Sequence, residues 1–551
     1  MVNKLKILFG VFILVFVLAG CRNSGEVTVR IDEGRTSVTR NSINLRIVVN
    51  DPQARNDNVS AVLRAHLFYE DERGRERERP SRSLNRTVMD ITFDGLEADR
   101  DYRLVIKRTS GEHTDLLEET FRTIDLGTEY NPIEITTITE LLAIEDDLSG
   151  HFRLMNDLDF NYHVNFDQTR IPFRAIGTRD RRFSGKFDGQ GFTIKNIYNF
   201  DTTTANFHLG IFATIATDGI VKNLNFENIN FDTKNEAGTV VNRSIDNFGV
   251  VAGINLGTIE NVHIRNLTVD AGSTRINSNF GGIAGTNDFR ILNSSITDSE
   301  FQVVNDRNIF IGSIVGLMTR QEEIENTLGE ISRTFAENIH INVTSQRGEI
   351  FVGGIAGETR ADIRDSFFKG TIQAEHTNVS AANVNSSVTA GGIVGRFGNG
   401  DIENVYSAAS ITVTAREVRH IHLGGLVGAF TGVFCRLINS YSLSDLEIVF
   451  QTTEQEVATD YRIGAIYGAP RFINSVAMPV PIIGSVNVFE NVNLFVWVGT
   501  SLIVNTTPDS STVSLNQLND LSFYIGEEES LNFSADIWDL TNLNGGRIRL
   551  R

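Results

Sequence analysis

Acidic residues recur near one turn of the chain, where paired carboxylates could act on a glycosidic bond. Asp362, Asp401 and Glu403 follow two similar glycine-rich stretches, and Glu260 occupies a comparable place earlier in the chain. Glycoside hydrolysis needs two carboxyl groups about 5–10 Å apart, and a lyase needs a Ca²⁺-binding acidic group with a basic residue. These acids are few and irregularly spaced, so we interpret them as turn residues in contact with solvent.

Two histidines in the stretch "RHIHLGG" are the second candidates for chemistry. His420 and His422 are two residues apart, so on a strand they point to the same face and could ligate a metal ion. A third ligand at a suitable spacing is missing, and the sequence contains no His-Glu-x-x-His motif, Gly-x-Ser-x-Gly motif or P-loop. We therefore expect surface or partly packed histidines, with no metal, no cofactor and no catalytic residue.

The N-terminus indicates a covalent modification. A short basic start, "MVNKLK", precedes an apolar run of about 14 residues, a length typical of a secretory signal rather than of a membrane span. The next segment, Leu18-Ala19-Gly20-Cys21, resembles the lipobox of bacterial lipoproteins, in which the cysteine becomes the acylated first residue. A plain signal peptide with a chance cysteine, or an uncleaved anchor, is the alternative. Acylation of Cys21 would leave Cys435 without an internal disulfide partner.

The composition bears on domains and partners. The chain has 551 residues, with 50 Lys and Arg against 69 Asp and Glu, a formal net charge of −19. A nucleic-acid-binding protein would present a basic face, so we expect no nucleic-acid partner. The length exceeds that of one ordinary core and predicts several domains.

Residues 27–125 alternate apolar and polar positions between polar turns, which predicts antiparallel strands. In "SINLRIVVND" every second residue from Ile43 to Val49 is apolar. Leu96 and Tyr102 flank a charged turn in a pattern that resembles the tyrosine corner of fibronectin type III domains. The resemblance implies a fibronectin-like or other Ig-like β-sandwich. An unclassified antiparallel β domain is the alternative.

A glycine cluster such as "GGIAG" recurs at intervals of about 31 to 41 residues in the second part of the chain. Each copy holds about three short apolar segments, which predicts a solenoid whose strands pair in parallel from coil to coil. A β-propeller, whose blades need four antiparallel strands in about 40–50 residues, and a string of β-sandwiches are the alternatives. The eight copies begin at Gly210, Gly249, Gly281, Gly312, Gly353, Gly391, Gly424 and Gly464.

The recurrence of glycine has a structural explanation. At a corner of each coil, neighbouring backbones can come so close that a Cβ atom would clash, or the backbone can require a positive φ. The glycines to which we assign this role are Gly249, Gly253, Gly281, Gly282, Gly285, Gly312, Gly316, Gly353, Gly354, Gly357, Gly391, Gly392, Gly395, Gly424, Gly425, Gly428, Gly464 and Gly468.

One Asn or Asp marks a second apolar strand after each glycine cluster. Equivalent residues of stacked coils lie about 4.8 Å apart, so their side chains can hydrogen-bond along the stack, and Asn tolerates the left-handed conformation of a tight turn. In the fourth copy the match follows an insertion. The predicted ladder consists of Asn223, Asn261, Asn293, Asn338, Asp365, Asn404, Asn439 and Asn474.

The segment ahead of the repeats shows a family resemblance. "FSGKFDGQGFTIKNI", together with Asn156–Asp159 and Ile176–Thr178, resembles the opening of bacterial surface proteins with GLUG repeats, and the resemblance covers about residues 130–480. It implies a short capping helix ahead of the coils, for which Thr137 or Thr139 can serve as N-cap. GLUG repeats also occur in secreted peptidases beside a metalloprotease domain. We find no such domain in this sequence, so the resemblance implies surface display or adhesion.

These patterns predict an all-β chain with a sandwich followed by a parallel β-helix, which we expect to be right-handed. The expected function is that of a non-catalytic, membrane-anchored surface lipoprotein that presents its β-helix to an extracellular protein or glycan. A carbohydrate-active enzyme and a structural spacer are the alternatives. The expected parts are a signal peptide (1–20), a tether (21–26), the fibronectin-like sandwich (27–125), the β-helix (131–500) and a C-terminal cap of the solenoid (501–551).

Overall fold

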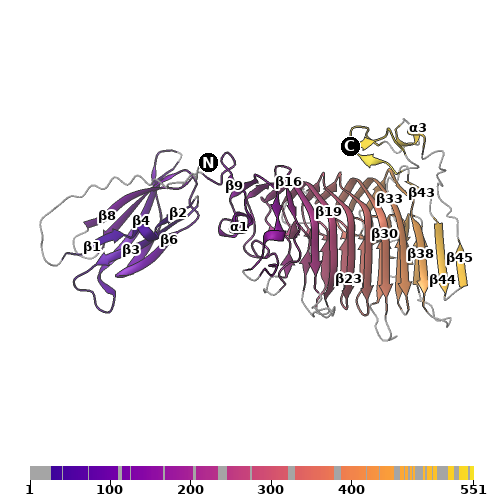
Figure 1. The fold of residues 1–551 in the computed structure, drawn as a ribbon, viewed down its shortest axis with the longest axis horizontal. Helices are drawn as coiled ribbons and strands as arrows, with labels where there is room; N and C mark the ends of the chain where they lie inside the picture. Colours follow the sequence, from indigo (N-terminus) through magenta and orange to yellow (C-terminus); the bar gives the residue numbers. More distant parts are fainter. Residues whose placement is uncertain are drawn as a thin grey trace. The chain divides into compact units, whose positions relative to one another are not determined.

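The protein consists almost entirely of β-strands and divides into two compact units between Asn131 and Pro132 (Figure 1). The computed structural model describes residues 26–551 except for 40, 72, 110–113, 125, 166–167, 203–206, 234–244, 274–275, 320–328, 378–385, 417, 433–434, 452–459, 465, 470–471, 474–475, 478–487, 491–492, 499–500, 506–518, 526–532 and 544–546. Within the described residues, no helix is long and apolar enough to cross a membrane.

The first unit contains two antiparallel sheets that enclose one hydrophobic core. The alternation predicted from Ile43 to Val49 is present, with the apolar side chains buried and the residues between them more exposed. One sheet consists of β1 (Thr28–Ile31), β2 (Ser37–Val38), β3 (Ile43–Asn50) and β6 (Val88–Phe93). The other consists of β4 (Asn58–Glu70), β5 (Glu76–Arg86), β7 (Asp101–Arg108) and β8 (Thr114–Arg122), and a short 3-10 helix, η1 (Glu33–Arg35), follows β1.

Tyr102 forms the corner that the sequence indicates. Its side chain is fully buried, and its hydroxyl oxygen accepts a hydrogen bond of 2.8 Å from the backbone N–H of Glu97. The hydroxyl of Thr123 donates to the carbonyl of the same Glu97. The turn before β7 is thus fixed from both sides. The assignment of this unit to the fibronectin type stays a prediction.

A short helix opens the second unit. It is α1 (Ile138–Leu142), preceded by β9 (Ile133–Ile135) and followed by η2 (Ala143–Asp146). Thr137 is the N-cap, because its side chain accepts a hydrogen bond from the Glu140 N–H while the Glu140 carboxylate accepts one from the Thr137 N–H. Leu141 and Ile144 are buried in the core of the second unit.

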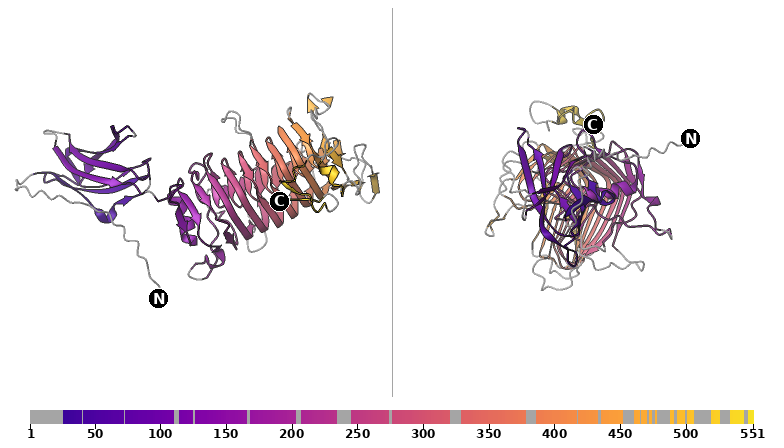
Figure 2. Two further views of the ribbon diagram at one scale, coloured as in Figure 1. Left: turned by 90° about the horizontal axis from the view of Figure 1, so that it is seen from above. Right: turned by 90° about the vertical axis from the view of Figure 1, so that its left-hand side faces the viewer.

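The second unit is a parallel β-solenoid of about seven turns, as the repeats predict (Figure 2). Its described strands form three sheets, which we call walls 1, 2 and 3. Their strands pair in parallel, except that the last two strands of wall 3, Asn493–Val498 and Ser501–Asn505, pair antiparallel. Wall 1 consists of β14 (His208–Leu209), β17 (Asn247–Phe248), β20 (Ser278–Gly281), β24 (Ile309–Gly312), β28 (Ile350–Gly353), β31 (Ser387–Gly391), β34 (His420–Gly424) and β39 (Asp460–Gly464). Wall 2 consists of β15 (Phe212–Ile215), β18 (Ala252–Asn255), β21 (Ala284–Asn287), β25 (Val315–Met318), β29 (Ala356–Thr359), β32 (Val394–Phe397), β35 (Val427–Phe430) and β40 (Tyr467–Ala469).

Wall 3 contains the longest strands, which lie side by side in Figure 1. Its central strands are β16 (Ile220–Asp232), β19 (Thr258–Ser273), β22 (Arg290–Leu292), β23 (Ser295–Asn305), β26 (Glu330–Ser332), β27 (Phe335–Ser345), β30 (Asp362–His376), β33 (Gly400–Ala415), β36 (Cys435–Ile438), β37 (Ser440–Ser442) and β38 (Asp445–Phe450). Its outer strands are β9, β10 (His151–Leu154), β11 (Leu158–Asp159), β12 (Lys186–Asp188), β13 (Thr193–Lys195), β43 (Val488–Glu490), β44 (Asn493–Val498) and β45 (Ser501–Asn505). Apolar side chains from all three walls form one core inside the coils.

Elements outside the three walls complete the second unit. One 3-10 helix, η3 (Phe160–Tyr162), follows β11. Two small antiparallel pairs and one helix occur toward the C-terminus, namely β41 (Phe472–Ile473) with β42 (Val476–Ala477), α3 (Leu521–Tyr524), and β46 (Trp538–Asp539) with β47 (Arg549–Leu550).

Candidate functional site

The repeated glycines lie where wall 1 bends into wall 2 and within wall 2 itself. A Cβ atom on Gly353 would lie 2.1 Å from the Ala356 carbonyl oxygen, and one on Gly354 would lie 2.2 Å from the Gly392 carbonyl oxygen. These glycines have no positive φ. Of the two explanations that the sequence allows, close approach of backbones is therefore the one that applies.

The Asn ladder lies at a bend inside wall 3. Six of its predicted members, Asn223, Asn261, Asn293, Asp365, Asn404 and Asn439, have φ between 46° and 55°. The amide of Asn261 donates to the side-chain oxygen of Asn223 at 2.9 Å, and that of Asn404 donates to Asp365 at 3.0 Å. Asn293 instead donates to Glu260 at 3.4 Å. Cys21 and Asn474 lie outside the described residues.

The prediction that Asn338 belongs to the first Asn ladder is wrong. The strand register places Arg333, with φ 51°, between Asn293 and Asp365. Asn338 donates instead to Asp298 at 2.7 Å, at a second bend of wall 3. The sequence signal for a second ladder at this bend is an Asn or Asp five residues after a member of the first ladder. The second ladder contains Asn196, Asn228, Asn266, Asp298 and Asn338, all with positive φ.

The second ladder ends where β27 meets β30. Glu337 aligns with Lys369 and Ile339 aligns with Gly370, so Asn338 has no counterpart in the next coil. A Cβ atom on Gly370 would lie 2.2 Å from the Ile339 carbonyl oxygen. The earlier coils therefore bend twice in wall 3, whereas β30 and β33 continue without the second bend.

We expect replacement of Asn404 by alanine to destabilise the solenoid by about 2 kcal/mol. About half of this comes from the left-handed conformation, with φ 55°, and half from the lost hydrogen bond to Asp365. Asn404→Gly should lose only the hydrogen bond to Asp365, because glycine adopts the left-handed conformation without strain, so its loss of stability should be about half as large. Urea denaturation of both variants measures the difference, and equal losses would contradict the conformational part.

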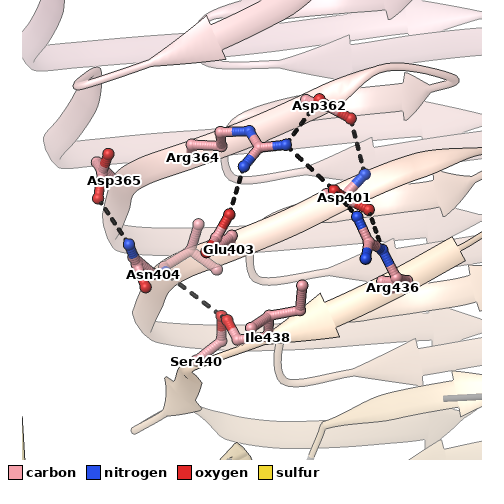
Figure 3. A network of polar contacts seen from close by, with 10 residues as sticks. Asp362, Arg364, Asp365, Asp401, Glu403, Asn404, Arg436, Ile438 and Ser440 are labelled. Carbon is pink, nitrogen blue, oxygen red and sulfur yellow. Dashed lines mark hydrogen bonds and ion pairs between the residues drawn. The ribbon is translucent and has the colours of Figure 1, made fainter. Parts of the chain in front are cut away.

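Three of the four acids singled out as potential catalytic groups, Asp362, Asp401 and Glu403, form an ion-pair network across neighbouring coils (Figure 3). The guanidinium of Arg364 in β30 donates to Asp362 at 3.0 Å and to Asp401 at 3.1 Å, and it also pairs with Glu403. Arg436 in β36 donates to Asp401 at 2.6 Å from its Nε. Asp362 and Asp401 are only 9% and 8% exposed. They are therefore buried ion-pair partners rather than the solvated turn residues that the sequence indicates.

The electrostatics of this network favour a structural role. Burial lowers the pKa of Arg364, but its hydrogen bond and ion pairs with Asp362, Glu403 and Asp401 outweigh burial, so that its pKa is raised. Each carboxylate has a fixed cationic partner, whereas a hydrolase needs one carboxyl group that exchanges a proton with substrate. The network holds neighbouring coils of wall 3 in register.

Replacement of Arg364 by methionine should lower the free energy of unfolding by about 3 kcal/mol. It leaves the carboxylates of Asp362, Asp401 and Glu403 close together, and of the two arginines in the network only Arg436 remains to pair with them. Arg360→Met is the matched control. Arg360 is 59% exposed and shares Glu358 with Arg396, so its loss should cost less than about 1 kcal/mol. Chemical denaturation of the two variants measures both values, and a smaller loss for Arg364→Met than for the control would contradict the prediction.

His420 and His422 lie on one face of β34 in wall 1, with ring centroids 6.0 Å apart. The strand register aligns His422 with Thr389 and Arg462 in the neighbouring coils, and His420 with Ser387 and Asp460. No group of three or more His, Cys, Asp and Glu residues in the described part of the chain could hold a metal ion.

Aromatic rings form a column along the outer face of wall 3. Phe335, Phe367, Tyr406 and Tyr441 come from successive coils, and their centroids lie 4.9, 5.1 and 5.0 Å apart. The rings stack on one another, so their faces are unavailable to a sugar ring. Described residues of the C-terminal segment, above all Trp538, cover the column, and the Tyr406 hydroxyl donates to the Ile548 carbonyl. These residues contact the side of the solenoid, whereas the sequence predicts a cap over its end.

The first unit has an open groove of about 470 Å³ that is lined by residues of β4, β5, β7 and β8. Phe68 and Tyr69 line it beside three arginines. All three arginines pair with acids, Arg100 with Glu97, Arg103 with Glu76 and Glu118, and Arg122 with Asp99 and Asp101. The groove therefore carries little net charge.

Comparisons with known proteins find distant relatives over parts of the chain. No family model matches the sequence. The chain is 28% identical over 184 residues to halomucin of Haloquadratum walsbyi, which covers 32% of this chain and 2% of halomucin. It is 29% identical over 140 residues to a Gly-rich membrane protein of Evansella cellulosilytica, which covers 25% of this chain and 15% of that protein. The chain thus spans a small fraction of either relative.

Solved structures overlap with longer parts of the chain at lower identity. An IgA1 protease is 15% identical, with a TM-score of 0.30, over 78% of this chain and 29% of the protease. A family 28 exopolygalacturonase of Yersinia enterocolitica is 10% identical, with a TM-score of 0.13, over 81% of this chain and 99% of the enzyme.

Proposed function

We propose that this protein is a non-catalytic lipoprotein of the cell surface that presents its solenoid to an extracellular protein or glycan. The observation that carries the proposal is the parallel register of wall 3, which β30 and β33 maintain over thirteen aligned residue pairs. Such a stack is stiff and elongated, because every coil is fixed by its two neighbours. A surface protein needs these properties to hold a binding face in a constant geometry.

Three further observations support the proposal. The sequence resembles GLUG-repeat surface proteins. The two distant relatives are halomucin and a Gly-rich membrane protein. Acylated Cys21 would supply the membrane anchor. Three of the four candidate acids, Asp362, Asp401 and Glu403, are held by Arg364 and Arg436.

The proposal is tested with the full chain, solubilised in detergent, on an array of glycans and matrix proteins. Release of new reducing ends from the arrayed glycans is measured in parallel. Binding without release supports display and adhesion. Release of reducing ends would overturn the proposal in favour of a carbohydrate-active enzyme, and the absence of any binding would favour a spacer.

The anchor has its own test. Cells that express the chain are grown with a palmitate analogue that carries a clickable group. The wild-type chain should acquire the label and fractionate with membranes, whereas Cys21→Ser should lose the label. Equal labelling of both chains would exclude Cys21 as the site of acylation.

A further inference from the structure

One face of wall 3 differs in composition from the rest of the solenoid. In the C-terminal parts of the long strands, alternate residues point into the core, and the residues between them align from coil to coil in three columns. We call these columns the polar face. They consist of Asn230, Thr268, Glu300, His340, Thr371, Ser410 and Asp445; of Asp232, Asp270, Gln302, Asn342, Gln373, Thr412 and Glu447; and of Val304, Thr344, Glu375, Thr414 and Val449.

The polar face contains acids but neither lysine nor arginine. Its carboxylates are those of Asp232, Asp270, Glu300, Glu375, Asp445 and Glu447. The basic residues of wall 3 occur earlier in the strands, where Lys369 pairs with Glu337 at 3.2 Å and Arg265 pairs with Glu227. The basic residues of the long strands β16, β19 and β30 thus precede the polar face, and the acids of the polar face come from β16, β19, β23, β30 and β38.

The polar face is also accessible to solvent. Each side chain in its columns is exposed or half-buried. On walls 1 and 2 most outward side chains are buried where the two walls pack against each other at their bend, and those of Phe310, Arg396, His420 and His422 are half-buried. Asn279 of wall 1 donates to Thr286 of wall 2 at 3.2 Å, and each is 9% exposed. Phe351 and Glu358 are both 2% exposed.

We infer that the polar face is the surface through which the solenoid binds, and that its partner is a protein surface rich in lysine and arginine. This inference rests on the proposed function and names the face and the partner chemistry. Carboxylates fixed on one rigid face attract a cationic surface before contact and select it on contact. A second copy of this chain, with a net charge of −19, and nucleic acids are repelled by the same face.

The inference is tested with poly-L-lysine as the basic probe and poly-L-glutamate as the negative control, both titrated against the full chain in detergent. The test variant E300Q/E375Q/E447Q removes three carboxylates of the polar face. The matched control D180N/D218N/D536N removes three exposed carboxylates of turns elsewhere in the same unit, so both variants change net charge equally.

We expect the test variant to bind poly-L-lysine about tenfold more weakly and with a shallower salt dependence, and the control variant to lose less than about threefold. Equal losses would show attraction by net charge alone and would overturn the inference. No loss in the test variant would also overturn it. Unchanged thermal midpoints verify that both variants are folded, and E300Q alone, with a loss of about twofold, provides a milder second variant.

Failure of this inference can be told apart from failure of the proposed function. If a ligand on the array binds the wild type and E300Q/E375Q/E447Q equally well, the proposed adhesive function is supported, but the polar face is not the binding surface. Release of reducing ends on the array overturns the proposed function whatever the result with poly-L-lysine.

Discussion

Replacing Gly392 by alanine is expected to destabilise the solenoid by about 3 kcal/mol, a large loss for the addition of one methyl group. The new Cβ atom would lie 2.1 Å from the Gly425 carbonyl oxygen and 2.2 Å from the Ser407 Oγ. The carbonyl belongs to the backbone of the next coil, so it cannot move without breaking the register of walls 1 and 2. The free energy of unfolding in urea measures the effect.

The matched control is Gly398→Ala in the same coil. Its nearest neighbour would be the Arg360 Cγ, at 2.8 Å, which belongs to a flexible and mostly exposed side chain. We expect this variant to lose less than about 1 kcal/mol. If the two alanine variants were equally stable, close approach of backbones would not explain the glycine repeat.

Replacing Trp538 by alanine should detach the C-terminal segment from wall 3. Trp538 is fully buried between Phe533 and the rings of Phe367 and Tyr406, and removal of such a side chain costs about 3–5 kcal/mol. The segment joins several coils at once, so its loss should expose the aromatic column. Increased binding of a hydrophobic dye and rapid tryptic cleavage after Arg547 are the expected results.

Trp538→Phe is the control for this prediction. It keeps a six-membered aromatic ring at the same place and loses the five-membered part of the indole, whose N–H has no acceptor among the described residues. We expect a loss of about 1 kcal/mol and little dye binding. Equal dye binding by the alanine and phenylalanine variants would mean that packing of this ring does not hold the segment.

The sequence predicts those parts of the fold that repeat or that depend on local chemistry. The glycine period predicts the coils, because each coil must make the same close bend. The capping box of Thr137 and the corner of Tyr102 are set by residues within five positions of each other, and both are present. The positive φ of the first Asn ladder follows in the same way from the tolerance of Asn for that conformation.

Contacts between distant residues could not be predicted. Arg436 and Asp401 are 35 residues apart, and Arg549 and Glu337 are 212 apart, so their pairing depends on the register of coils and not on local sequence. The misplacement of Asn338 has a similar cause. An insertion precedes it, and the rung of the first ladder is occupied by Arg333, which a search for Asn or Asp does not find.

The loss of the second bend at Gly370 has a consequence for how such a chain can grow or shrink. Coils on the same side of Gly370 have similar cross-sections. If one whole coil on either side were duplicated or removed, the coils brought together would therefore still match in shape. A coil inserted on the other side of Gly370 would stack on coils of a different cross-section, and wall 3 would not align between them. Lengthening of this molecule through tandem duplication should therefore occur within either segment and not across their junction.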